Sequence, residues 1–244
     1  MKLMIVRHAD PDYSIDSLTE KGWREAEYLA ERLAKENADA YYVSPLGRAK
    51  DTASLTLQRL GRTAEECGWL REFCAPVYKP NRPDAESIPW DWLPQDWLAE
   101  ERFLQPDAWQ QPEVFAQSGV PAEYARVTAG LDTLLARHGY ERDQTGRFYR
   151  PVQPNEQTIV LFCHFGVECV LLSHLLQLSP MVLWQGFCAA PSSVTVLHTE
   201  ERRPGIAVFR MAAFGDTSHL YAHGEPPAFA ARFCEVYGNG DRQD

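Results

Sequence analysis

The sequence predicts an α/β fold built on a largely parallel sheet. Short apolar runs alternate along the chain with amphipathic segments, which is the pattern of β-α-β units. The opening run, "KLMIV", is apolar almost throughout, as expected of a strand covered on both faces. With 244 residues and 45% hydrophobic content, the chain can form one continuous core. We therefore expect a single domain over residues 1–244.

The first quarter of the chain is expected to form two strand-helix units. The four elements are a strand over 2–6, a helix over 18–37, a strand over 38–45 and a helix over 46–61. The first helix is predicted from apolar or small residues at helical spacing: Trp23, Ala26, Leu29, Ala30 and Leu33. Thr19 can cap its start, and Gly61 can end the second helix.

The second half of the chain is expected to repeat this unit. A strand over 158–163 turns at once into an apolar helix over 165–178. Two further strands, over 192–199 and 205–212, are separated by the polar turn "EERRP" and predict a hairpin at a sheet edge. The tail, 224–244, is expected to carry one short helix.

The segment between the two halves, 76–120, is rich in proline and tryptophan and lacks a long strand pattern. It holds four of the seven tryptophans: Trp90, Trp92, Trp97 and Trp109. We interpret it as an inserted helical lid within the single domain, because long irregular segments in compact domains are often functional. Its aromatic residues could line a pocket or pack on the outside of the domain.

Charge and hydropathy exclude several classes of partner. The net charge is −10, and no basic tract relieves it, so no nucleic acid is expected as a partner. The apolar start is too short for a signal-peptide core, and no stretch approaches the roughly 18 apolar residues of a membrane span. We expect a cytoplasmic protein with no membrane association.

Three sets of polar residues follow predicted strands. Arg7 and His8 follow the first strand, Arg48 lies at the start of the helix after the second, and His164 follows the third. Ligands of open parallel sheets bind beyond the carboxyl ends of the strands, so we expect these side chains to share one pocket. Two guanidinium groups can clamp phosphate oxygens. An imidazole held neutral among them keeps a lone pair for nucleophilic attack.

Four stretches of the sequence, "VRHADP", "SPLGRAKDTA", "WLREF" and "FCHFGVECVLL", resemble the successive motifs of the histidine phosphatase superfamily. This group contains the cofactor-dependent phosphoglycerate mutases and many broad phosphatases. The resemblance spans residues 4 to 176, and "FGDTSHL" (214–220) extends it. It implies a three-layer αβα sandwich of the phosphoglycerate mutase-like kind, mostly parallel, with an antiparallel edge strand and an inserted helical lid.

The resemblance also assigns roles to residues. His8 would be the nucleophile that becomes phosphohistidine, Arg7 and Arg48 would bind the phosphoryl group, and His164 would donate to its oxygens. Glu72 matches the acid that protonates the leaving alkoxide and then activates water. Two positions depart from the family pattern, because Ala9 and Phe165 stand where glycine is frequent. Phe165 is expected to narrow the wall of the substrate site.

The function implied is that of a phosphomonoesterase of the histidine acid phosphatase type, in the phosphatase branch, acting on a small phosphorylated metabolite. No metal and no cofactor is expected, because the arginines and His164 neutralise the phosphate charge and no metal-binding motif is present. Asp10 and Asp12 bring negative charge close to the nucleophile. We expect them to point away from the phosphate or to contact a cationic part of the substrate.

Other functions stay open. A mutase must hold a second phosphate, and the only cations of the insertion are Lys79, Arg82 and Arg102. A catalytically weak member that only binds phosphate or a phosphoprotein is allowed by Ala9 and Phe165. A dinucleotide-binding domain is disfavoured, because no GxGxxG follows the first strand. The substrate and the oligomeric state cannot be predicted from the sequence.

Overall fold

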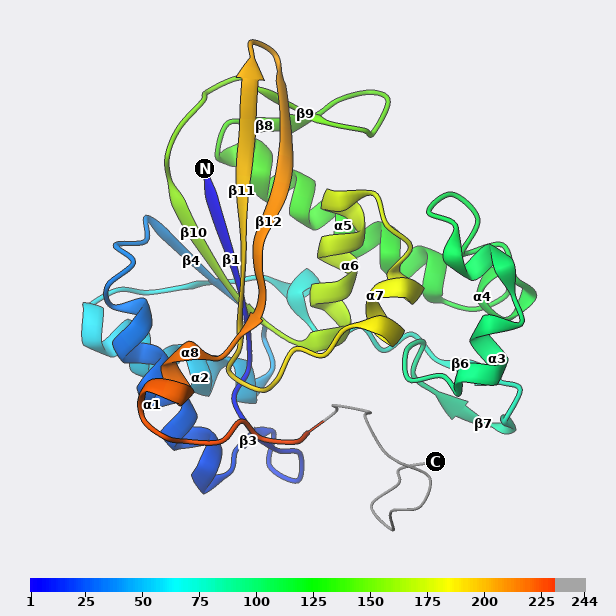
Figure 1. The fold of residues 1–244 in the computed structure, drawn as a ribbon, viewed down its shortest axis with the longest axis horizontal. Coiled ribbons are helices and arrows are strands. Elements are labelled where there is room, and N and C mark those ends of the chain that lie inside the picture. The colour runs from blue at the N-terminus through cyan, green and yellow to red at the C-terminus, as the bar shows by residue number, and fades with distance from the viewer. Residues whose placement is uncertain (231–244) are drawn as a thin grey trace.

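The computed structural model describes residues 1–230 of the chain (Figure 1). Within this part, eight strands form one sheet in the order β5-β4-β10-β1-β11-β12-β9-β8. In chain order they are β1 (Lys2–Arg7), β4 (Ala40–Val43), β5 (Glu65–Glu66), β8 (Tyr140–Arg142), β9 (Tyr149–Pro151), β10 (Thr158–Cys163), β11 (Val194–Arg203) and β12 (Ile206–Asp216). The first strand of the chain therefore lies in the middle of the sheet.

Helices cover both faces of the sheet (Figure 1). Their bounds are α1 (Glu20–Leu33), α2 (Gly47–Leu60), α5 (Val120–Arg137), α6 (Phe165–Leu176), α7 (Pro180–Gly186) and α8 (Ser218–Ala222). Successive side chains of a strand point to opposite faces. Leu3 and Ile5 accordingly pack into the core under α5 and α6, whereas Met4 and Val6 pack with α1 and α2. The predicted α/β fold, with helices on both sides of a central sheet, is confirmed.

The sheet changes direction at β1. The strands from β5 to β1 are parallel, and those from β1 to β8 pair antiparallel. The predicted hairpin is formed by β11 and β12, but it does not lie at the sheet edge, because β9 and β8 extend the sheet beyond it. These two strands are only three residues long, so they leave little periodicity in the sequence.

The helix α1 has the predicted start, and the predicted residues of its buried face are buried except for Trp23. The Thr19 hydroxyl accepts a hydrogen bond from the Gly22 backbone N–H, as expected of an N-cap. Trp23, expected on the buried face, is exposed, and Glu25 is fully buried in its place. The helix α2 ends at Gly61, whose φ of 62° lies in the left-handed region that glycine adopts freely.

The insertion is less helical than expected. It begins with a hairpin and continues in short helical turns: β6 (Val77–Lys79), β7 (Arg82–Ser87), α3 (Pro94–Leu98), η2 (Glu101–Leu104) and α4 (Glu113–Ala116). Figure 1 shows these elements together at one end of the molecule, far from α1. Trp90, Trp92 and Trp109 are buried in the core cluster under α5 and α6. The aromatic residues thus mainly fix the insertion to the domain.

The remaining short elements are β2 (Pro11–Asp12), β3 (Ser17–Leu18) and η1 (Gly68–Leu70). Residues 224–230 of the tail contain no helix, and residues 231–244, where the predicted helix would continue, lie outside the described part. Among the described helices, none has the length and apolar character needed to cross a bilayer.

Candidate active site

The carboxyl ends of β4, β10 and β1 bring the predicted residues together. These strands are parallel neighbours, and Arg7 lies opposite Cys163. The His8 N–H donates to the Cys163 carbonyl at 2.9 Å, which sets His8 beside His164. The centres of the two imidazole rings are 5.1 Å apart. The predicted convergence of strand ends therefore follows directly from the parallel register.

His8 is oriented by its own backbone. Its Nδ1 lies 2.8 Å from the Ala9 carbonyl oxygen. A carbonyl can only accept, so Nδ1 carries the proton and Nε2 keeps the lone pair. Burial lowers the pKa of His8 well below its usual value, and the charge of Arg7 lowers it further. The side chain is thus a neutral imidazole whose Nε2 keeps its lone pair.

The contacts of His164 are compatible with the opposite tautomer, through Ser44. The Ser44 hydroxyl lies 2.7 Å from Nε2 of His164 and accepts from the Leu46 N–H, so its own hydrogen is free to point to Nε2. When Ser44 donates to Nε2, the proton of neutral His164 lies on Nδ1, which is buried and has no partner among residues 1–230. Burial lowers the pKa of His164, and the neighbouring His8 lowers it further. Nδ1 can therefore donate to an anion in the site.

Arg7 is held in place by backbone carbonyls and an aromatic ring. Its guanidinium donates to the carbonyl oxygens of Ala189 and Ala230, and its Cζ lies 5.8 Å from the centre of the Phe165 ring. The Nε atom of Arg7 is buried without a partner in the described chain. Phe165 is only 2% exposed, so it forms a wall under the arginine.

Arg48 is paired with a carboxylate that sequence reasoning missed. Its Nη1 lies 2.5 Å from Asp16, whose second carboxylate oxygen accepts the Gly47 N–H at 2.7 Å. Asp16 therefore joins the arginine to the N-terminus of α2, where the helix dipole favours an anion. The residue has a φ of 49°, in the left-handed region. We infer that Asp16 fixes the direction of the Arg48 guanidinium.

Replacing Asp16 by glycine should lower kcat/KM for an aryl phosphate about tenfold, the effect of one lost hydrogen bond to a charged group. Glycine adopts the left-handed conformation freely, so the change removes the carboxylate without backbone strain. Steady-state kinetics on Asp16→Gly and on the control Asp12→Gly measure this effect. An unchanged or higher kcat/KM in Asp16→Gly would contradict the positioning role.

Glu72 lies in the loop after η1, and its carboxylate contacts the N-terminus of α6. Its carboxylate accepts the backbone N–H groups of Phe73 at 2.7 Å, Val167 at 3.0 Å and Gly166 at 3.3 Å. These bonds favour the ionised form, but burial dominates and raises the pKa of Glu72. A carboxyl with a raised pKa beside Arg7 can both give and take a proton.

The insertion closes the site near Glu72. The Trp90 ring packs edge-on against Phe165, and its Nε1 donates to the Phe73 carbonyl. Gly166 is necessary in this place, because an added Cβ would meet Trp90 at 2.6 Å and Glu72 at 2.7 Å. Trp90 thus helps to fix the Glu72 carboxyl.

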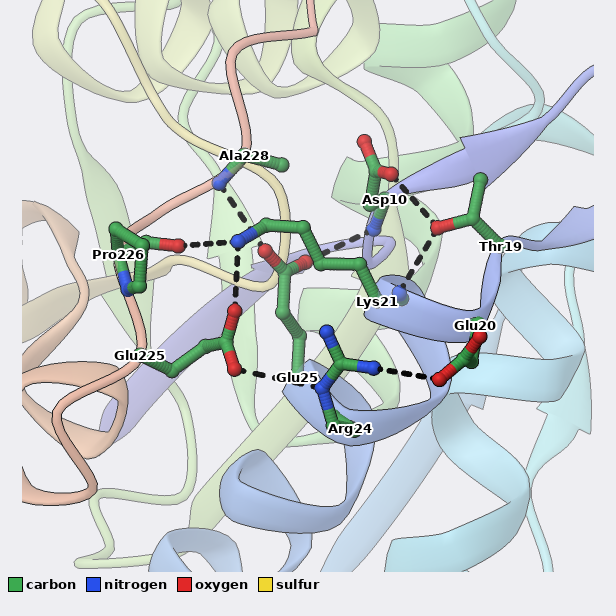
Figure 2. A network of polar contacts seen from close by, with 10 residues as sticks. Asp10, Thr19, Glu20, Lys21, Arg24, Glu25, Glu225, Pro226 and Ala228 are labelled. Atoms are coloured by element: carbon green, nitrogen blue, oxygen red, sulfur yellow. Dashed lines mark hydrogen bonds and ion pairs between the residues drawn. The ribbon is translucent and has the colours of Figure 1, made fainter.

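The acidic residues that follow the nucleophile point away from it. The Asp10 carboxylate accepts from the Thr19 hydroxyl at 2.7 Å, and Asp12 accepts from Ser14. Figure 2 shows how buried Glu25 connects this loop to the C-terminal segment. Its two oxygens accept the N–H groups of Asp10 and Ala228 at 2.9 and 3.1 Å.

Lys21 binds the same C-terminal segment through the Glu225 carboxylate and the Pro226 carbonyl (Figure 2). A few residues further on, the Ala230 carbonyl accepts from Arg7 at 3.2 Å. The C-terminal segment 225–230 therefore runs from contacts with α1 to a contact with Arg7.

Glu168 is a second buried carboxyl near Arg7. It lies in the first turn of α6 and is 1% exposed. Burial raises its pKa to about 7, although the charge of Arg7 opposes the rise. The folded state therefore favours the protonated form of Glu168 more than the unfolded chain does. The resulting stabilisation is complete below the ordinary pKa of 4.5 and is lost as the pH rises through 7.

Replacing Glu168 by glutamine should remove this part of the pH dependence of stability. The wild-type protein should lose about 3 kcal/mol of unfolding free energy through Glu168 between pH 4 and pH 8. Denaturant unfolding at both pH values measures the loss, with exposed Glu101→Gln as the control. If Glu168→Gln shows the same loss as the control, the assignment of this pH dependence is wrong.

Metal ligands are not gathered in the described part of the chain. Within residues 1–230, no group of three His, Cys, Asp or Glu side chains is arranged to hold a metal ion. The predicted catalytic set is made of two arginines, two histidines and Glu72.

The family model described as "Histidine phosphatase superfamily (branch 1)" matches residues 3–211. Solved structures with the same fold include a phosphoserine phosphatase from Entamoeba histolytica, with 18% identity and a TM-score of 0.58 over 90% of this chain and 98% of that chain. A mycobacterial glucosyl-3-phosphoglycerate phosphatase has 21% identity and a TM-score of 0.58 over 88% and 98%. The alpha-ribazole phosphatase from Shigella flexneri has 19% identity and a TM-score of 0.56 over 89% and 97%. No curated protein matches the sequence.

Proposed function

This chain belongs to the histidine phosphatase superfamily, and on that premise we propose that it hydrolyses small phosphate monoesters through a phosphohistidine on His8. The observation that carries the proposal is the hydrogen bond between His8 Nδ1 and the Ala9 carbonyl. It leaves Nε2 unprotonated beside two arginines. The similar solved structures are named as phosphatases of phosphoserine, glucosyl-3-phosphoglycerate and alpha-ribazole. These names agree with a small substrate.

In the first step, Nε2 of His8 attacks phosphorus, and the bond between phosphorus and the ester oxygen breaks. The protonated Glu72 carboxyl gives its proton to the leaving alkoxide. Arg7, Arg48 and the Nδ1–H of His164 bind the phosphoryl oxygens, whose charge increases in the transition state. The products of this step are the free alcohol and the phosphoenzyme.

In the second step, the Glu72 carboxylate takes a proton from water, and the water oxygen attacks phosphorus. The bond between phosphorus and His8 breaks, and inorganic phosphate leaves. Glu72 is again protonated and His8 is again neutral, so the cycle closes without a metal ion. The raised pKa of Glu72 suits a group that alternates between acid and base.

The contacts of the insertion favour hydrolysis over phosphate transfer. Lys79 is buried and donates to the carbonyl oxygens of Trp90 and Asp91, and Arg102 is paired with Glu100. Two of the three cations that a mutase could use for a second phosphate are therefore engaged elsewhere. We keep mutase activity as the second candidate, because Arg82 and groups outside the insertion can still contact a ligand.

A screen of phosphate monoesters in EDTA tests the proposal. Sugar phosphates, nucleotides, phosphoglycerates and phosphopeptides are incubated with the wild-type protein and with His8→Asn. Release of inorganic phosphate from at least one class by the wild-type protein only is expected. Transfer of phosphate between hydroxyl groups without release supports the mutase. Tight phosphate binding without either reaction supports a binding protein.

A further inference from the structure

A groove of about 650 Å³ lies between the loop after η1 and the start of α5. Its lining includes Arg71, Glu72, Cys74, Gly119, Glu123 and Arg126. Glu72 belongs both to this groove and to the predicted catalytic set. The alcohol that receives a proton from Glu72 must lie on the side of that carboxyl that is open to a ligand, and the groove provides such a space.

The charges of the groove are unequal. Glu123 and Arg126 form a two-point ion pair at 2.6 and 2.8 Å, and Arg126 also donates to the Gly68 carbonyl. Arg71 is exposed, and its side chain has no hydrogen bond or ion pair with any residue in 1–230. When Glu72 is protonated, the groove carries one uncompensated positive charge, that of Arg71.

Arg71 also acts on the predicted catalytic residues. The pKa of His164 is lowered mainly by burial, and then by His8, Arg48 and Arg7. The charge of Arg71 lowers it further. Arg71 precedes Glu72 in the chain and lines the same groove, and it is open to solvent. A free arginine offers several donors in a planar fork, which matches a carboxylate or a phosphate.

We propose that the groove holds the alcohol part of the substrate and that Arg71 binds an anionic group on it, either a carboxylate or a second phosphate. This inference rests on the proposed phosphatase function and makes it more specific. The preferred substrates are then phosphate monoesters of hydroxy acids or of diol bisphosphates. Cys74 has a small side chain and Gly119 has none, which leaves room for such a group beside Glu72.

Matched substrates test the assignment. O-phosphoserine and phosphoethanolamine differ by one carboxylate, and propanediol bisphosphate and propanediol monophosphate differ by one phosphate. Arg71→Gln should lower kcat/KM about tenfold for the member that carries the extra anion, the effect of one lost hydrogen bond to a charged group. For the other member of each pair and for p-nitrophenyl phosphate, the same variant should change kcat/KM less, because those substrates carry no group that binds Arg71. Whichever pair responds identifies the anion.

Two further variants complete the test. Arg71→Lys should restore part of the preference, because it keeps the charge. Arg202→Gln, at the far end of the β11–β12 hairpin, should change nothing. An equal response of both members of each pair to Arg71→Gln would overturn the inference. Failure of the wild-type protein to hydrolyse any monoester would instead overturn the proposed function itself.

Discussion

His8→Asn should lower kcat for every phosphate monoester by about 10⁴-fold or more, the scale of losing a catalytic nucleophile. Asparagine has no nitrogen lone pair that can form the phosphoenzyme. It is smaller than histidine and polar, so it fits the buried site between β1 and β10. The expected result is loss of turnover in a folded protein that still binds phosphate through Arg7, Arg48 and His164.

Steady-state kinetics with p-nitrophenyl phosphate measure this effect, and thermal unfolding checks the fold. The matched control is His198→Asn, because His198 is exposed on β11. The control should keep wild-type turnover. Residual activity of a tenth or more in His8→Asn would mean that another group attacks phosphorus.

Glu72→Gln should separate the two chemical steps. Glutamine cannot supply a proton, so turnover of alkyl phosphates should fall about 10²- to 10⁴-fold. p-Nitrophenol leaves without a proton, so the first step with its phosphate ester should be much less affected. Water activation in the second step still needs the Glu72 carboxylate. The variant should therefore accumulate the phosphoenzyme.

Rapid mixing of Glu72→Gln with p-nitrophenyl phosphate measures this separation. A burst of p-nitrophenol equal to the amount of enzyme, followed by slow turnover, is expected. Glu66→Gln, on an exposed strand end, serves as the control and should give wild-type kinetics. If the variant loses activity toward alkyl and aryl phosphates to the same extent and shows no burst, Glu72 is not the acid.

The pH dependence of the first step follows from the same group. Since burial raises the pKa of Glu72, its acid form persists to higher pH than in an exposed glutamate. Turnover of alkyl phosphates should decline as the pH rises through this raised pKa, and turnover of aryl phosphates should decline less.

The convergence of the site could be predicted because it depends on strands. An apolar run fixes where each strand ends, and parallel pairing places the ends of β1 and β10 side by side, with Arg7 opposite Cys163. Arg7, His8 and His164 were therefore predictable from local sequence. Glu72 was found only through the resemblance, since a short loop residue carries no periodic signal.

Other parts of the site left no such signal. Asp16 reaches Arg48 from a loop whose path depends on a left-handed residue, and the sequence does not fix that path. Glu25 is buried, although the hydrophobic pattern of its helix predicts that a charged residue at this position is exposed. The contact of Arg7 with Ala230 uses a backbone carbonyl, which any residue provides. In the sequence, only the nearby acidic residues Asp10 and Asp12 indicated that a carboxylate could lie close to the site.

The most direct test of the account is to identify the phosphorylated residue. Glu72→Gln is mixed with a labelled aryl phosphate, quenched, digested and analysed by mass spectrometry under alkaline conditions. The account predicts label on the peptide that contains His8, stable in base and lost in acid, and no label in the double variant with His8→Asn. Label on another residue, or turnover of the ester with no labelled protein at any time, would contradict it.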